Sequence, residues 1–397
     1  MDLGVTPSGV FQSRATAHVF TALLSLGSMS RVDLSRHTGL SPAAVTRAVR
    51  PLLDERYIVE APAEQSRGAG IGRPATSLRV RSDRAAFIGV KITGDEVIAV
   101  LPDLRAQITA TRHVPLPARD VDAVVPLVAG VVDELRGHLG RRQGRLRALG
   151  VSVSGDTDPL AGFVRSSAFL GWRDVPLTYL LQSATGVPTT LDNDVRALAV
   201  AEQLFGAGAG VPSFVLVTVG AGIGCGIVVH DRVIAGARGV AGELGHMPVL
   251  PDDGPECVCG SRGCLEAIAS DHAILRDVRN LTGDERMTLG QCLELAHQGV
   301  PAVRAVYARA GQAIGLGIAS VANLIGPSRI ILSGEGLAAY GLFEDQIRKV
   351  FAGHAFGTVA DCELIVRPLP FEEWARGAAA IAIQRAVNFG AGTFAAR

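Results

Sequence analysis

The sequence lacks an uninterrupted apolar run of the length that crosses a membrane. Residues 214–229 are sixteen uncharged residues, but four glycines interrupt them, and a spanning helix needs about 20 apolar residues. We expect a β-hairpin there. The first thirteen residues have no basic segment followed by an apolar core, so a secretion signal is not indicated. Both absences predict a soluble, cytoplasmic protein without membrane partners.

Charged residues are also few, and basic and acidic residues are equal in number. Charged residues make up 19% and apolar residues 48% of 397 residues, and the formal net charge is zero. This composition excludes disordered, collagen-like and coiled-coil classes and suits two or three domains. Residues 1–80 nevertheless hold nine Arg and six acidic residues. A basic excess at the N-terminus is typical of an attached nucleic-acid-binding module.

A disulfide framework is absent as well, although the sequence has six cysteines. Cys257, Cys259 and Cys264 fall within eight residues, shortly after His246. Three thiolates and one imidazole complete a tetrahedral zinc shell and leave no place for a catalytic water. We therefore predict structural zinc at these four residues; the alternative is a loop of buried free thiols. The other cysteines lie alone, at Cys225, Cys292 and Cys362.

Residues 1–82 begin with the pattern of a helix-turn-helix. Helices are expected at 14–26 and 32–37, and a third starts at Ser41 and Pro42, after a turn at Gly39. Ser as N-cap and Pro at the first helical position favour such a start. An exposed recognition helix reads bases in the major groove. The predicted DNA-binding residues on it are Ser41, Ala43, Ala44, Thr46, Arg47 and Arg50.

A wing is expected to follow these helices. Residues 57–60 and 77–80 have the pattern of two strands, and the glycine-rich stretch between them carries Arg67 and Arg73. Arginines on such a tip suit insertion into a minor groove. The alternative is a helical bundle used for dimerisation, with solvated arginines. The turn, the cap and the basic wing together favour a winged helix-turn-helix that binds double-stranded DNA.

From about residue 85 the pattern changes to strands that alternate with helices. Strands are expected at 87–92, 97–101, 108–114, 149–153, 189–191, 214–219, 224–229 and 329–332, with helices at 121–139, 195–205, 302–324 and 371–386. This order predicts an α/β fold of two lobes with a cleft. We place lobe I at 83–190, with a C-terminal helix near 371–390 returning to it, and lobe II at 191–370.

Several motifs in this region resemble the ROK family of sugar kinases and repressors. They are the glycine run at 220–224, the segment 242–246 that ends at His246, the cysteine loop with Leu265 and Glu266, and two upstream segments at 170–172 and 192–194. The similarity covers about residues 85–390, and the N-terminal head matches the repressor branch. The resemblance implies a two-lobed, actin-like ATPase fold with sugar bound in its cleft beside the zinc loop.

Carried over by motif, the resemblance implies five sugar-binding residues. Asn193 and Asp194 would bond sugar hydroxyls, and Glu243, His246 and Glu266 would hold the opposite end of the ring. Carboxylates accept from hydroxyl groups, and an amide both donates and accepts. Asp192 and Asp194 could instead cap the helix that begins near residue 195. We keep that interpretation for Asp192 and assign Asp194 to the sugar site, where it corresponds to the base of the kinases.

The phosphate-binding loops depart from the kinase pattern. Lys91 stands where the family has an acid, Ala221 replaces a threonine, and Glu335 enters the third glycine loop. Phosphoryl transfer depends on such loops and on bound magnesium. We therefore expect no catalytic residue, no kinase activity and no requirement for ATP.

These features predict a sugar-responsive repressor that binds a pseudo-palindromic operator as a homodimer or homotetramer. An active ATP-dependent sugar kinase with a DNA-binding head is the alternative. A third possibility is a repressor with a vestigial cleft that answers to a protein partner or a phosphorylated sugar.

Overall fold

The computed structural model describes residues 9–62, 76–250 and 254–387. The chain forms two compact units. Unit 1 comprises Met1–Gly210 and Glu372–Arg397, and unit 2 comprises Val211–Phe371. Among the described residues, no helix is both long and apolar enough to cross a membrane.

Unit 1 begins with the helical head that the sequence predicts. Its helices are α1 (Arg14–Leu26), α2 (Arg31–Thr38) and α3 (Pro42–Asp54), and its strands are β1 (Met29–Ser30), β2 (Ile58–Pro62) and β3 (Thr76–Val80). The strands form an antiparallel sheet in the order β1-β3-β2. Gly39 ends α2 with φ 69°, the left-handed conformation that a tight turn between helices requires.

The head is packed into unit 1 through a shared core. Phe11, Phe20 and Tyr57 stack within it, with ring centroids 4.9–5.7 Å apart. The same apolar cluster continues into Phe87 at the start of β4 and Ile383 near the end of α12. Helix α1 also packs against α6. The head is therefore continuous with the core of unit 1.

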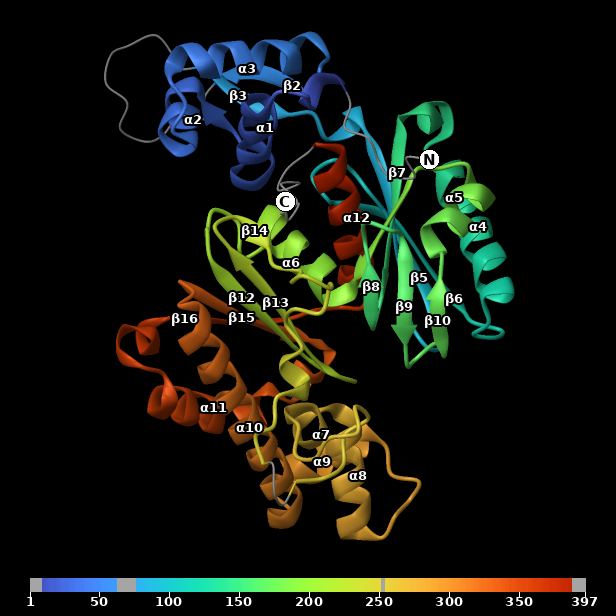
Figure 1. Ribbon diagram of the computed structural model, residues 1–397, viewed down its shortest axis with the longest axis vertical. Helices are drawn as coiled ribbons and strands as arrows, with labels where there is room; N and C mark the ends of the chain where they lie inside the picture. The colour runs from blue at the N-terminus through green and yellow to red at the C-terminus, as the bar shows by residue number, and fades with distance from the viewer. Residues whose placement is uncertain (1–8, 63–75, 251–253, 388–397) are drawn as a thin grey trace. The chain divides into compact units, whose positions relative to one another are not determined.

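A five-stranded mixed sheet forms the body of unit 1, in the order β11-β7-β4-β5-β6. Helices α4 and α5 cover one face, and α6 and α12 cover the other (Figure 1). The strands are β4 (Ala86–Ile92), β5 (Glu96–Pro102), β6 (Ile108–Pro115), β7 (Leu146–Val153) and β11 (Thr189–Asn193), and the helices are α4 (Val121–Gly137), α5 (Leu177–Thr185), α6 (Asp194–Phe205) and α12 (Glu372–Ala386).

The parallel strands β4, β7 and β11 bring their carboxyl ends to one edge. Ile92 is in register with Val153, and Val153 with Asn193. Residues at or next to these three strand ends are therefore neighbours in space. Glycines at 89 and 150 let α12 lie directly on the sheet, because a Cβ at either position would collide with its backbone.

The boundary between the units differs from the expected lobe boundary at residue 190. Strand β11 pairs in parallel with β7, and α6 packs on α12, so both belong to unit 1 and the division falls after Gly210. The short sheet β10-β9-β8 was not expected either. Its strands are Asp156–Asp158 (β8), Phe163–Ser167 (β9) and Trp172–Val175 (β10).

Unit 2 is built on a second five-stranded sheet, in the order β14-β13-β12-β15-β16. The expected hairpin is present as β12 and β13, and β15 and β16 run parallel to β12. The strands are β12 (Phe214–Val219), β13 (Ile223–Val229), β14 (Arg232–Val233), β15 (Arg329–Gly334) and β16 (Glu363–Pro368), and the helices are α7 (Leu265–Ala269), α8 (Asp271–Thr282), α9 (Leu289–His297), α10 (Pro301–Ile325) and α11 (Tyr340–His354).

Candidate functional site

The outward face of α3 carries the side chains predicted to contact DNA. Ser41, Ala43, Thr46, Arg47 and Arg50 are exposed, and Ala44 is half-buried. The Ser41 side chain accepts the N–H of Ala44 at 3.2 Å, and the Thr46 hydroxyl donates to the Pro42 carbonyl at 2.9 Å. Arg50 approaches Asp54 at 3.9 Å. Arg47 and Arg50 are therefore the exposed cations of this helix.

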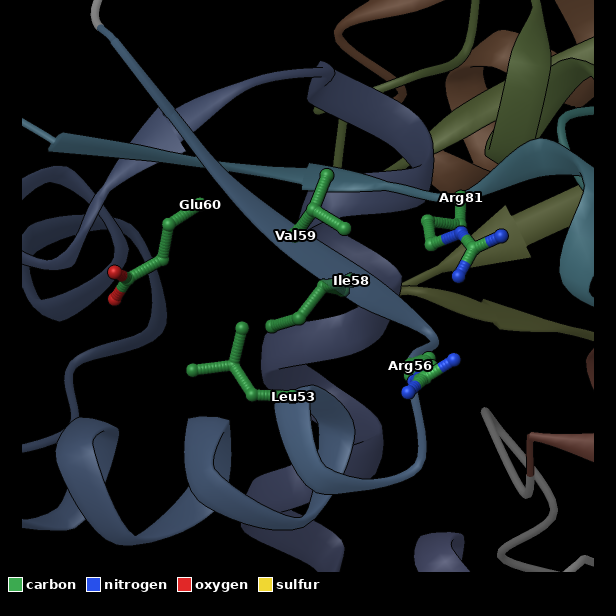
Figure 2. Close-up of a pocket in the computed structure, with 6 residues that line it drawn as sticks. All are labelled: Leu53, Arg56, Ile58, Val59, Glu60 and Arg81. Carbon is green, nitrogen blue, oxygen red and sulfur yellow. The ribbon is translucent and has the colours of Figure 1, made fainter.

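The two strands predicted to form the base of a wing pair antiparallel. Strands β2 and β3 pair from Ile58 with Val80 to Pro62 with Thr76. Arg67 and Arg73, predicted for its tip, lie outside the described residues. A shallow depression beside β2 is lined by Leu53, Arg56, Ile58, Val59, Glu60 and Arg81. Figure 2 shows Arg56 and Arg81 at one end of it and Glu60 at the other. It contains none of the predicted sugar-binding residues.

A buried polar cluster lies at the strand ends of unit 1. The ammonium of Lys91, on β4, forms an ion pair with the Oδ2 atom of Asp194 at the start of α6. The Ser154 hydroxyl, just after β7, lies 2.9 Å from Lys91 Nζ and donates to Asp194 Oδ2 at 2.6 Å. Lys91 is 5% exposed and Asp194 is 7% exposed. Trp374 covers the cluster from α12, with its ring centroid 5.7 Å from Lys91 Nζ.

The environment of Asp194 keeps its carboxyl group ionised. Burial by itself raises the pKa of Asp194, but the Lys91 ammonium opposes this effect. Hydrogen bonds from Lys91, Ser154 and the Val195 N–H lower the pKa further, so that it falls below its ordinary value. A general base must be able to take a proton. A carboxylate held by an ammonium and a hydroxyl is poorly suited to that role.

Asn193, not Asp192, is the N-cap of α6. Its Oδ1 atom accepts the N–H groups of Val195 and Arg196 at 2.9 and 3.2 Å, and its amide donates to the Gly155 carbonyl at 3.1 Å. The capping role expected of Asp192 is therefore wrong. Asp192 forms an ion pair with Arg196 at 2.6 Å instead, because it lies one residue too early to reach the first helical N–H groups.

Four side chains of unit 2 gather at the predicted zinc site. The ligand atoms of His246, Cys257, Cys259 and Cys264 all lie within 4.8 Å of one another. Cys257 Sγ is 3.4 Å from His246 Nδ1, and Cys259 Sγ is 3.7 Å from Cys264 Sγ. Sulfurs on one tetrahedral zinc ion are separated by ~3.8 Å, given Zn–S bonds of about 2.3 Å. The donor set therefore fits zinc in both type and spacing.

The surroundings of the clustered thiols shift their pKa values in opposite directions. A hydrogen bond from the Ser261 backbone lowers the pKa of Cys259 to about 7, whereas burial raises that of Cys264 to about 12. Zinc binding requires thiolates and therefore releases protons. His246 faces the cluster with Nδ1, and its Nε2 atom lies 4.0 Å from Glu243 Oε2.

The turn between β12 and β13 is held by two carboxylates. Glu266 Oε2 accepts the Ile223 N–H at 3.0 Å, and Glu335 Oε1 accepts the Ala221 N–H at 3.1 Å. Glu266 thus positions the glycine turn in addition to the sugar-binding role predicted for it. Of the five predicted sugar-binding residues, Asn193 and Asp194 belong to unit 1, and Glu243, His246 and Glu266 belong to unit 2.

The sequence did not reveal which partners these residues have. In the sequence Lys91 is a departure from the family pattern, and its contact with Asp194 joins residues 103 positions apart. A buried lysine in a strand that is otherwise apolar was the available signal, because such a charge requires a paired acid.

The chain has one five-stranded sheet in each unit, a glycine-containing turn between β12 and β13, and Asp194 directly after β11. These features define an α/β protein of the actin-like sugar-kinase fold. The chain belongs to the ROK family, whose model matches residues 87–385. It is 30% identical over 328 residues to the DNA-binding transcriptional dual regulator NagC of Escherichia coli K12, covering 81% of this chain and 80% of that one.

Two solved structures show the same fold. A ROK family transcriptional regulator, described as a homologue of the E. coli MLC protein, is 28% identical with a TM-score of 0.77 and covers 94% of this chain and 96% of its own. A ROK family glucokinase from Streptomyces griseus, in complex with glucose and AMPPNP, is 29% identical with a TM-score of 0.65. It covers 76% of this chain and 100% of its own. NagC and the MLC homologue support the repressor branch of the family.

Proposed function

We propose that this protein is a sugar-responsive transcriptional repressor in which the kinase-like region senses a sugar without phosphorylating it. The observation that carries the proposal is the buried ion pair between Lys91 and Asp194. It places an ammonium on the carboxylate that corresponds to the kinase base. The regulators NagC and the MLC homologue support the same assignment.

The proposed sugar-binding residues are Asn193 and Asp194 in unit 1 and Glu243, His246 and Glu266 in unit 2. Zinc would be held by His246 and the three clustered cysteines, and when bound it would fix the conformation of the loop. The His246 ring, oriented by such a ligand bond, then presents Nε2 as a hydrogen-bonding group. Operator DNA would contact α3 through Arg47 and its neighbours, in the cytoplasm.

Helix α6 supplies a route from the sugar site to the DNA-binding head. Its first residue is Asp194, and Phe205 at its last turn packs against the core of the head. Ten of its twelve residues are buried. Gly377 brings α12 against the α6 backbone near Ala197. A rigid, buried helix transmits a displacement of its first turn to its last. Because α1 packs against α6, a sugar bound at Asp194 would change the position of α1.

Such coupling predicts that DNA and an inducing sugar weaken each other by the same factor. The test is fluorescence anisotropy of the full chain on DNA from upstream of its own gene, at fixed salt, with a panel of free sugars. Specific binding that one sugar shifts in the wild type, and that Asp194→Asn no longer shifts, supports the proposal. Binding no tighter than to random DNA, or binding that no sugar alters, contradicts it.

An active sugar kinase with a DNA-binding head is the second candidate, favoured by the likeness to the S. griseus glucokinase. An assay of ADP release over common hexoses distinguishes the two. We expect no turnover above that of the Asp194→Asn variant. Turnover that this substitution abolishes would establish the kinase instead.

A further inference from the structure

The side chain of Glu335 lies directly against the glycine turn of unit 2. Its Oε1 atom accepts the Ala221 N–H at 3.1 Å. A Cβ at Gly220 would collide with the same carboxylate group. The carboxylate therefore occupies the surface of the turn, at the place where its backbone N–H is available.

The fold determines this position. Strand β15 runs parallel to β12, with Ser333 in register with Thr218, so the residues that follow the two strands are adjacent. Gly334, at φ 104°, packs on the Val219 backbone, where a side chain would collide. Glu335 then begins a short 3-10 helix. Its side chain is thus directed to the turn by the register and by a glycine.

The chemistry of the turn is that of an anion site. Backbone N–H groups in glycine-rich turns bind phosphate and other anions, and a carboxylate presents the same kind of charged oxygen acceptor. Asp271 also lies beside the turn and donates its N–H to the Gly220 carbonyl at 2.8 Å. Burial, together with the charge of Glu335, raises the pKa of Asp271 to about 6. Glu266 accepts the Ile223 N–H of the same turn at 3.0 Å, so three carboxyl groups lie at the turn and together repel a polyphosphate.

We propose that Glu335 is an internal occupant of a latent polyphosphate-binding turn, and that it excludes nucleoside triphosphates from unit 2. The inference does not depend on DNA or sugar binding. It explains how the turn keeps its glycines while its anion-binding N–H is used by the chain itself.

The test is isothermal titration of the full chain with magnesium and AMPPNP, for the wild type, Glu335→Ala and Glu335→Gln. We expect at least tenfold tighter binding by Glu335→Ala than by the wild type. Glu335→Gln should lie between the two, because the amide keeps the size of the side chain but loses its charge. Glu285→Ala is the matched control, since it removes an exposed acid from the same unit and should leave binding unchanged.

Hydrogen exchange of the Ala221 amide gives a second readout without nucleotide. Exchange should be faster in Glu335→Ala than in the wild type and should slow again when AMPPNP is added. Equal exchange in both proteins, or wild-type affinity for AMPPNP equal to that of Glu335→Ala, overturns the proposal. Operator binding by Glu335→Ala should match the wild type, so a failure of the proposed regulatory function is seen separately.

Discussion

The carboxyl group of Asp194 and the thiols of the cysteine cluster can both carry negative charge, but the positive charge that balances each has a different source. Asp194 in unit 1 is buried and paired with Lys91 of the same chain. In unit 2, His246 and the clustered cysteines have their donor atoms close together, and the hydrogen bonds among those atoms involve no charged side chain. The carboxylate of Asp194 thus has its counter-charge within the chain, whereas the donor set of the cysteine cluster fits a zinc cation in type and spacing.

Removal of zinc should therefore have the largest effect. Structural zinc binds with a free energy on the order of 10 kcal/mol. If about 5 kcal/mol of this binding free energy stabilises the fold of unit 2, its loss would lower the melting temperature of that unit by roughly 10–20 °C. We expect Cys264→Ser to abolish zinc binding, measured as bound metal per chain, and to produce this fall in calorimetry. Cys362→Ser lies outside the cluster and should retain both. A chelator that strips the metal without changing the melting temperature would contradict a structural role.

The second prediction breaks the internal pair of unit 1. Lys91→Met leaves a buried carboxylate without its cation, which costs about 3–5 kcal/mol of unfolding free energy at pH 7. Lys349→Met is the matched control, because Lys349 is exposed and its loss should change stability by less than about 0.5 kcal/mol. Urea unfolding measures both. The double variant Lys91→Met with Asp194→Asn should be less destabilised than the sum of the single variants; additive losses would contradict the pairing.

The unfolding free energy should depend on pH in opposite directions in the wild type and in Lys91→Met. In the wild type the pKa of Asp194 is lowered. The stabilisation that ionised Asp194 contributes is therefore complete at a pH above about 4, which is its pKa in the unfolded chain. It is lost as the pH falls through the lower pKa of Asp194 in the folded protein. In Lys91→Met, burial without a cation raises this pKa, so the variant should lose stability as the pH rises instead.

The local parts of the fold were predictable from the sequence because they depend on neighbouring residues. The limits of α1, the Ser41 cap and the β12–β13 hairpin follow from caps, glycines and apolar spacing, and all agree with the structure. The cysteine cluster was predictable for the same reason, since its ligands occupy one short segment apart from His246.

Contacts between distant segments were not predictable in this way. The pairing of β11 with β7 moved the unit boundary, and nothing in residues 189–193 alone indicates which sheet they join. The contacts of Lys91 with Asp194 and of Glu335 with Ala221 depend equally on strand register. Asn193 was expected to bind sugar, and only the start of α6 shows that its amide caps a helix.

The third prediction concerns Arg47 on α3. Its guanidinium is exposed, whereas the ammonium of Lys91 is buried and paired. Arg47→Ala should weaken operator binding by about 1–3 kcal/mol if the guanidinium contacts a base, while leaving sugar affinity unchanged. Arg141→Ala removes an exposed arginine outside the head and should leave operator affinity unchanged. Anisotropy at one salt concentration measures both. Equal affinities of wild type and Arg47→Ala for the operator would remove Arg47 from the recognition surface.

The smallest expected effect is on the proposed coupling between sugar binding and operator binding. Phe205 ends α6 and packs on the core of the head, so its truncation should loosen the connection without touching Asp194. Coupling free energies are typically 1–3 kcal/mol, and we expect Phe205→Ala to reduce the effect of sugar on operator affinity by about threefold.

Sugar affinity in the absence of DNA should stay within about twofold in that variant, because the polar cluster lies at the other end of α6. Phe356→Ala is the matched control, since Phe356 is 84% exposed in unit 2 and should leave coupling intact. The measurement is operator affinity with and without saturating sugar for all three proteins. A coupling factor in Phe205→Ala equal to that of the wild type would show that the sugar signal does not pass through the last turn of α6, and the shared core around α12 would then be the remaining connection within unit 1.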